Sequence, residues 1–318
     1  MYRVRAARGR SDFDATGYSL KALWLFIVVL IPLTACASTS DTNASKSELE
    51  IDSFVYQLQD YRDDKLEQIA SLPQDLAIID LARDGGADYF RRDEIDMLHD
   101  SGKKTLSYFS IGSLENYRPE YARVLSEAPE LIANRWGEWP DENFVTYWAD
   151  SWWEFVVRPR VDQAISAGFD GVYLDVLLAY EDISPQFAAD KNRDDLARLM
   201  VDLVIRISEY ARKQNENFWI FPQNSPELRT YPGYVDAIDG IGVEDLFFQN
   251  ADVPCFQDYC QENLDHVRAI KDAGKIVLAT DYADSPKNIR TACAAYRREG
   301  FAGYVADIDL GHPRPSCR

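Results

Sequence analysis

The sequence predicts a single (β/α)8 barrel, the TIM-barrel fold, and three observations support this prediction. From residue 50 onward, short runs of β-branched and aromatic residues alternate with longer segments of helical periodicity, which is typical of a parallel α/β sheet. Eight such runs fit into about 270 residues, and no linker-like segment separates them. A doubly wound sheet with an added subdomain is the alternative, but no glycine-rich phosphate-binding motif supports it.

The eight expected strands are short and rich in apolar residues. In chain order they are Phe54–Gln59, Leu76–Leu81, Thr105–Ile111, Gly171–Val176, Phe218–Gln223, Ile238–Glu244, Lys275–Asp281 and Ala302–Ile308. Helices are expected between most of them, including Arg92–Ser101, Trp152–Ala167 and Arg193–Gln214. Several helical segments end at a glycine, the residue that most easily adopts the left-handed conformation at a helix end. These glycines are Gly102, Gly168, Gly274 and Gly300.

The residues before the barrel resemble an export signal. Four arginines and Lys21 precede the apolar run Ala22–Ala35, which has the length of a signal-peptide core and is short for a membrane span. The run ends in Leu33-Thr-Ala-Cys36, which resembles the lipobox of bacterial lipoproteins, where cleavage leaves a lipidated cysteine. An uncleaved anchor and a plain secretory signal are the alternatives, and both also place the domain outside the cytoplasm.

These features predict three parts of the chain. We expect a lipoprotein signal peptide over residues 1–35, a lipidated Cys36 with a flexible Ser/Thr-rich tether over 36–49, and the barrel over 50–318. The protein is then anchored in the bacterial cell envelope, on the periplasmic or extracellular face.

The composition excludes several classes of partner. With 53 acidic against 34 basic residues, the net charge is -19, and a protein this acidic repels a phosphate backbone, so we expect no nucleic-acid partner. The three histidines are widely scattered and no zinc-binding spacing occurs, so we expect neither a metal nor another cofactor.

Four cysteines follow the predicted lipidation site. In an oxidising compartment an even number suggests two disulfides, and four cysteines allow three connectivities. We favour Cys255–Cys260, which closes a short loop, and Cys293–Cys317, which ties the C-terminus to a late helix. Buried free thiols are the alternative.

Acidic residues close each of the four even-numbered predicted strands. Strand four ends in Asp175 and strand six in Glu244, and the period-two alternation of each strand points these acids into the barrel. Asp80 and Asp307 end strands two and eight in the same way. Because each interior layer of such a barrel takes its side chains from alternate strands, the four acids are expected near one layer at the mouth.

Four neighbouring carboxyl groups predict acid/base chemistry. Repulsion and partial burial should raise the pKa of at least one of them towards neutrality. A protonated carboxyl beside an ionised one is what a glycosidase requires, and Asp175 and Glu244 are therefore the candidate catalytic pair. Asp80 and Asp307 can equally well be helix N-caps or arginine partners.

Residues suited to sugar binding surround these acids. Trp136, Trp139 and Trp148 fall in the long loop region after strand three, and aromatic faces stack on sugar rings. Trp152 and Trp153 more simply pack a helix onto the barrel. The candidate substrate contacts are Asp80, Tyr108, Glu115, Arg118, Tyr147, Trp148, Tyr180, Gln223, Asn224, Asp281 and Asp307. For Glu115 and Arg118, a structural ion pair is an equally good interpretation.

The strand-end motifs taken together resemble glycoside hydrolase family 114, the endo-α-1,4-polygalactosaminidases and related proteins. The most specific is Gly168-Phe-Asp-Gly-Val-Tyr-Leu-Asp175. The other matching segments are Tyr56–Gln59, Ile79–Asp80, Tyr108–Gly112, Glu115–Arg118, Tyr147–Trp148, Pro222–Asn224 and Gly242–Phe247. The resemblance implies a barrel hydrolase that cleaves α-1,4-linked galactosamine polymers, with Asp175 as nucleophile and Glu244 as general acid/base.

We therefore expect an exported, lipid-anchored, endo-acting and retaining hydrolase of a cationic amino-sugar polysaccharide. De-N-acetylated galactosamine is cationic near neutral pH, and a strongly acidic domain attracts such a polymer. Two alternatives stay open: a non-catalytic polysaccharide-binding lipoprotein on the same barrel, and a hydrolase of another α-linked galactose-type glycan.

Overall fold

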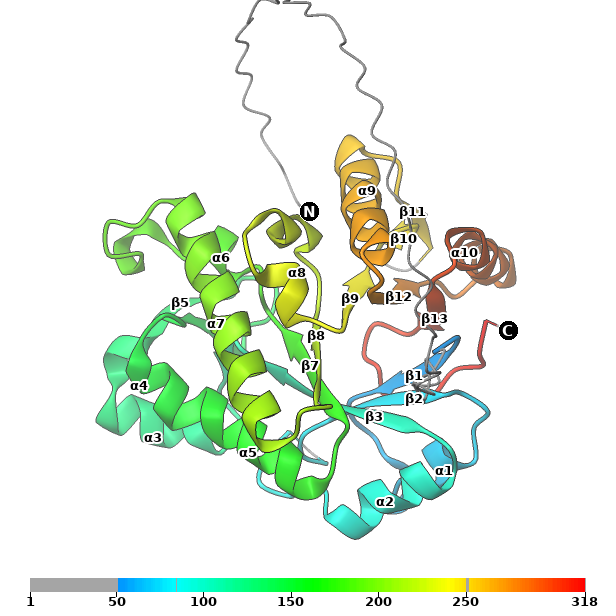
Figure 1. Cartoon of the computed structure of the whole chain (residues 1–318), viewed down its shortest axis with the longest axis horizontal. Coiled ribbons are helices and arrows are strands. Elements are labelled where there is room, and N and C mark those ends of the chain that lie inside the picture. The colour runs from blue at the N-terminus through cyan, green and yellow to red at the C-terminus, as the bar shows by residue number, and fades with distance from the viewer. Residues whose placement is uncertain (1–50, 84, 250–251, 318) are drawn as a thin grey trace, which may run out of the picture. The chain divides into compact units, whose positions relative to one another are not determined.

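Eight parallel strands form the barrel in the computed structural model (Figure 1). The structure describes residues 51–83, 85–249 and 252–317. Residues 51–318 make up a compact unit of their own. The predicted signal peptide, the lipidation site Cys36 and the tether lie outside the described residues.

The barrel strands belong to two parallel sheets that meet edge to edge. The first has the order β1 (Phe54–Gln57), β2 (Leu76–Asp80), β3 (Lys104–Ser110), β7 (Gly171–Asp175) and β8 (Trp219–Pro222). The second has the order β13 (Ala302–Ala306), β12 (Ile276–Tyr282) and β9 (Gly240–Glu244). A parallel bridge between Gln223 and Gly242 joins β8 to β9, and β13 contacts β1, which closes the ring. All eight predicted strands are confirmed, with ends that differ by at most two residues.

The main helices lie on the outer side of the strands (Figure 1). The α-helices are α1 (Glu67–Ala70), α2 (Arg92–Asp100), α3 (Glu120–Glu127), α4 (Asp150–Trp152), α5 (Arg158–Ala167), α6 (Ala179–Asp182), α7 (Arg193–Gln214), α8 (Tyr234–Ala237), α9 (Asp258–Asp272) and α10 (Pro286–Glu299). Short 3-10 turns are η1 (Arg62–Asp64), η2 (Pro129–Leu131), η4 (Pro185–Phe187) and η5 (Pro226–Thr230). None of the helices in the described part of the chain is long and apolar enough to span a membrane.

The helix predicted over Trp152–Ala167 contains a wider turn. A π-helical segment, η3 (Trp153–Val157), separates α4 from α5. Pro159 has no N–H to donate to the preceding turn, which disfavours regular α-helical hydrogen bonding at this point. The indole of Trp152 donates to the carbonyl of Ile111 at 2.9 Å, and both Trp152 and Trp153 are buried, so the packing role is confirmed for both.

A small antiparallel sheet follows β3, where the sequence suggested a long loop. Its order is β4 (Ser113–Glu115), β6 (Glu142–Val145) and β5 (Ile132–Arg135). Each strand has only three or four residues, and alternation over so few positions does not distinguish a strand from a loop. This sheet brings residues 113–145 to the end of β3 at which Ser110 lies.

Three tyrosine rings pack together inside the barrel. They belong to Tyr56, Tyr108 and Tyr173, and their centroids lie 5.4–6.5 Å apart. A Cβ atom on Gly242 would lie 1.8 Å from the hydroxyl oxygen of Tyr173. Gly242 is therefore required, because the absence of a side chain leaves room for Tyr173 near the end of β9, which carries Glu244.

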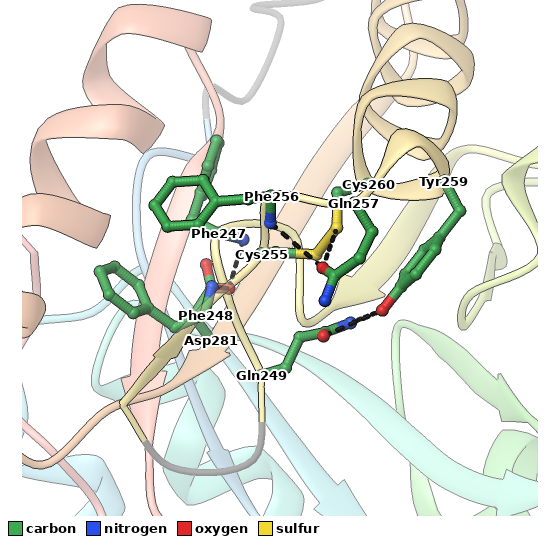
Figure 2. The surroundings of a disulfide bond; sticks show 9 residues. All are labelled: Phe247, Phe248, Gln249, Cys255, Phe256, Gln257, Tyr259, Cys260 and Asp281. Atoms are coloured by element: carbon green, nitrogen blue, oxygen red, sulfur yellow. Dashed lines mark hydrogen bonds between the residues drawn. A yellow bond between two sulfur atoms is a disulfide. The ribbon is translucent and has the colours of Figure 1, made fainter. Parts of the chain in front are cut away.

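Both predicted disulfides are confirmed. Cys255–Cys260 links the segment after the hairpin β10 (Phe248–Gln249) and β11 (Val253–Pro254) to the first turn of α9 (Figure 2). Cys293–Cys317 links α10 to the C-terminal segment. The second bridge closes the longer loop, with a sequence separation of 24 residues against 5.

Candidate active site

Asp175 and Glu244 are the last residues of β7 and β9, at the carboxyl end of the barrel. The end of β8 lies between them. The backbone N–H of Gln223 donates to the carbonyl of Leu174 in β7, and Gln223 forms a parallel β-bridge with Gly242 in β9. Both acids are half-buried, and the charge of Glu244 helps to raise the pKa of Asp175. The structure thus brings the predicted catalytic pair together at one site.

Asp175 is held by two donors. The hydroxyl of Tyr108 lies 2.5 Å from Oδ2, and the backbone N–H of Val176 lies 2.6 Å from Oδ1. Val176 has φ 61°, a left-handed conformation that is strained for a β-branched residue. This turn places the amide of Val176 against the carboxylate that precedes it.

Glu244 is held by side chains from two neighbouring strands. The amide of Gln223 donates to Oε2 at 2.5 Å and that of Asn224 at 3.2 Å, while the hydroxyl of Tyr282 donates to Oε1. The hydroxyl of Tyr56 donates to Oε1 of Gln223 at 3.1 Å, which fixes the amide with its NH₂ group towards Glu244. Gln223 and Asn224 therefore lie at the site, where they orient a carboxylate, and their contact with substrate stays a prediction.

Burial raises the pKa of Asp175 to about 7, and the nearby charge of Glu244 adds to this effect. The hydrogen bond from Tyr108 and that from the Val176 amide act in the opposite direction. Burial also raises the pKa of Asp245, the next residue after Glu244, to about 8, again with a contribution from Glu244. The expected shift is therefore found at Asp175, and burial also raises the pKa of Asp80 from its ordinary value.

The structure corrects the prediction for Asp80, Glu115 and Arg118. Asp80 is buried and binds Arg118 through both carboxylate oxygens at 2.8 Å. The same guanidinium binds Glu115, at 3.0 Å from Nε and 2.9 Å from Nη2. The three side chains are at most 6% exposed, so they form a buried ion cluster and not a set of substrate contacts.

Asp307 and Asp281 also bind protein groups. Asp307 pairs with Arg314 of the C-terminal segment. Asp281 is fully buried, where Oδ1 accepts from the backbone N–H groups of Phe247 and Phe248 at 2.7 Å each (Figure 2) and Oδ2 accepts from Tyr296 at 2.5 Å. Both aspartates hold segments of the chain in place at the barrel end. The fully buried Asp281 cannot contact substrate as predicted, whereas for the half-buried Asp307 this contact stays a prediction.

Two of the predicted aromatic contacts are engaged elsewhere. Tyr147 is buried and its hydroxyl donates to the carbonyl of Leu196 at 2.8 Å, and the buried Tyr180 donates to Glu227. Both tyrosines therefore support loops, contrary to prediction. Trp148 is half-buried with the Lys191 ammonium 4.9 Å from its ring centroid, and its contact with substrate stays a prediction.

Three residues of the site were missed. Tyr56 lies inside the first strand, where alternation alone could have placed it in the barrel. Tyr282 is one residue beyond the predicted end of its strand, and the real strand includes it. Glu142 belongs to β6, a strand too short to be predicted from alternation. It lies near Asp175, and burial together with the charge of Glu115 raises its pKa to about 8.

Comparison with known proteins decides the family. The model of glycoside-hydrolase family GH114 matches residues 34–318. The chain belongs to family GH114. This GH114 member is therefore a glycoside hydrolase. Asp175 and Glu244 lie at the carboxyl ends of their strands, which is where the active sites of TIM barrels are found.

Relatives and solved structures agree with this membership. An uncharacterized protein of Deinococcus radiodurans is 31% identical to this GH114 chain over 255 residues, which cover 80% of each protein. The glycoside hydrolase domain of PelA from Pseudomonas aeruginosa superposes with a TM-score of 0.64 at 17% identity, covering 83% of this chain and 97% of that domain. Ega3 of Aspergillus fumigatus, in complex with galactosamine, superposes with a TM-score of 0.63 at 17% identity. The match covers 81% of this chain and 92% of Ega3. At this identity the two structures show a shared barrel fold.

Proposed function

We propose that this GH114 enzyme hydrolyses an α-1,4-linked polysaccharide that contains galactosamine, by endo attack and with retention of configuration. The observation that supports it best is the pair Asp175 and Glu244, each half-buried at a strand end and each fixed by hydroxyl and amide donors. The likeness of the fold to Ega3, described in complex with galactosamine, supports the choice of sugar.

In the proposed reaction, Glu244 protonates the glycosidic oxygen while Asp175 attacks the anomeric carbon. The bond to the leaving sugar breaks, and a covalent glycosyl ester forms on Asp175. Glu244, now ionised, takes a proton from water, and the resulting attack releases the sugar and restores both groups. Tyr282, Gln223 and Asn224 keep Glu244 in one orientation through both steps.

The charge around the pair favours a cationic substrate. Within the ranges that the structure describes, no lysine, arginine or histidine forms an ion pair with Asp175 or Glu244. The nearby arginines are already bound, Arg118 to Asp80 and Glu115, and Arg160 to Glu120. An ammonium group on the substrate would therefore meet uncompensated carboxylates, and the net charge of -19 favours the approach of a polycation.

We also propose that the enzyme is exported and held in the cell envelope by a lipid on Cys36. The apolar run before the Leu33–Cys36 motif supports this, and two disulfides fit an oxidising compartment. Cell fractionation tests it: the wild type is expected in the detergent-extracted membrane fraction, and Cys36→Ala is expected to lose that location. Equal distribution of the two proteins would contradict the anchor.

The activity is tested by incubating the enzyme and its Glu244→Gln variant with α-1,4-linked galactosamine oligomers and analysing the products by mass spectrometry. Shorter oligomers from the wild type alone are expected. Retention of the oligomers without cleavage would instead indicate a binding protein. Cleavage confined to neutral α-linked galactose oligomers would contradict the proposed sugar while leaving the hydrolase intact.

A further inference from the structure

The loop between β9 and α9 presents an aromatic side chain that takes no part in the core. Phe256 is 87% exposed, the largest exposed fraction among the large apolar side chains in the described part of the chain. Val253 and Pro254, close to it in sequence, are exposed as well. A single exposed apolar residue is ordinary, but three within four positions of one βα loop of a TIM barrel indicate a contact surface.

This loop is held in place at both ends of its exposed part. The disulfide Cys255–Cys260 joins it to α9 directly before Phe256 (Figure 2). Two residues before Pro254, the carboxylate of Asp252 accepts from the amide and from the hydroxyl of Ser285, each at 3.1 Å. Because these contacts already order the loop, a ligand that stacks on Phe256 loses little free energy to ordering it.

The loop starts from the Glu244 side of the catalytic pair. The backbone N–H of Cys255 donates to the carbonyl of Phe247 at 2.9 Å, and Phe247 follows Glu244 by three residues. These connections keep the Cα atoms of Phe256 and Glu244 within about 20 Å of each other. Asp175 ends β7, which is separated from β9 by β8, so the loop adjoins the proposed acid/base and not the proposed nucleophile.

A polysaccharide chain is the ligand that fits this surface best. The face of an aromatic ring stacks on a sugar ring, and the exposed Gln257 and Asp258 next to Phe256 can hydrogen-bond hydroxyl groups at its edge. A lipid surface is the other candidate for an exposed apolar loop. The net charge of -19 opposes close approach to an anionic membrane surface, so the polymer is favoured.

We infer that Phe256 is a stacking platform for a sugar on the leaving-group side of the scissile bond, so that the enzyme prefers chains long enough to reach it. This inference rests on the proposed function, in which Glu244 protonates the oxygen of the leaving sugar. The acid/base then stands on the side of the departing chain, and the loop that follows it lies along that chain. A leaving group too short to reach Phe256 gains nothing from it.

The test separates the two sides of the scissile bond. A long α-1,4-linked galactosamine oligomer extends past Glu244, whereas an α-galactosaminyl fluoride has no sugar in its leaving group. Phe256→Ala should lower kcat/KM on the long oligomer about 5- to 20-fold and change kcat/KM on the fluoride less than about twofold. Phe256→Trp keeps an aromatic face and should retain the wild-type values. Leu125→Ala, which shortens an exposed apolar side chain on α3, is the control and should also behave as the wild type.

Three results would overturn the role of Phe256. The first is an equal loss on the oligomer and on the fluoride, and the second is no loss on either. The third is unchanged kcat/KM together with weaker binding to vesicles of phosphatidylglycerol and phosphatidylethanolamine, measured in the Cys36→Ala background. That result would make the loop a membrane contact.

A binding measurement separates this inference from the proposed function. In the Glu244→Gln background, calorimetry should show the Kd of the long oligomer raised about fivefold or more by Phe256→Ala, with the Kd of a disaccharide unchanged. An unchanged Kd for the long oligomer would overturn the stacking role. A wild type that cleaves no galactosamine oligomer would contradict the proposed function, whatever Phe256→Ala does to binding.

Discussion

The hydroxyl of Tyr108 donates to Oδ2 of Asp175 at 2.5 Å, and this contact opposes the effect of burial on the carboxyl. Burial and the neighbouring Glu244 together raise the pKa of Asp175 to about 7, although Tyr108 and the Val176 amide both favour the ionised form. A nucleophile must be ionised. The balance of these groups therefore sets the pH at which the enzyme becomes active.

The first prediction concerns Tyr108→Phe. Loss of the hydroxyl removes a donor to the ionised carboxylate, so the pKa of Asp175 rises further. The acid limb of the kcat/KM profile, expected near pH 7 in the wild type, should move to higher pH. Tyr282→Phe, which removes a donor to Glu244, should lower kcat without moving this limb. An unchanged profile for Tyr108→Phe would contradict the assignment.

The second prediction concerns stability and pH. Because the pKa of Asp175 is raised in the folded state, the native protein binds more protons than the unfolded chain between about pH 4 and 7, and stability falls as pH rises through this window. Asp175→Asn should therefore raise the free energy of unfolding at pH 8 by roughly 1–3 kcal/mol, and change it little at pH 4. Thermal unfolding at both pH values measures this, and an equal effect at both would contradict it.

The third prediction concerns the buried ion cluster. Arg118→Met leaves Asp80 and Glu115 buried without their shared partner, so we expect a loss of about 3–5 kcal/mol in the free energy of unfolding. Arg198→Met, in an exposed pair with Asp194, should cost less than about 1 kcal/mol. Urea unfolding compares the two variants. Similar losses would indicate that the cluster is not buried as described.

The fourth prediction concerns the disulfides. Loss of Cys293–Cys317 by a double serine substitution should cost about 3 kcal/mol, and loss of Cys255–Cys260 about 2 kcal/mol, because the first closes the longer loop. Unfolding of each double variant in urea provides the measurement. The opposite order would show that loop closure does not control their contributions.

The sequence alone predicted the barrel and the position of its principal acids. Each strand is a local run of apolar residues, and period-two alternation is enough to point Asp175 and Glu244 inward. Gln223 and Asn224 followed from the same argument, since they end the strand between those two acids. These features depend on a few neighbouring residues, so no knowledge of distant contacts was needed.

The roles of the other acids could not be predicted in this way. Asp80 ends a strand just as Asp175 does, but Arg118, 38 residues later, returns to bind both of its oxygens. Asp307 and Asp281 are likewise bound by groups from other segments, Arg314 and the amides of residues 247 and 248. Whether a strand-end carboxylate faces substrate or a protein donor depends on these contacts with residues distant in the sequence, which hydrophobic periodicity does not reveal.

Covalent trapping tests the central claim most directly. The Glu244→Gln variant would be incubated with an α-galactosaminyl fluoride, whose leaving group needs no proton, and then analysed by intact-protein mass and peptide mapping. The variant lacks the base that activates water, so a glycosyl adduct should accumulate on the peptide that contains Asp175. Turnover without an adduct, or an adduct on another carboxylate, would contradict the assignment of Asp175 as nucleophile and Glu244 as acid/base.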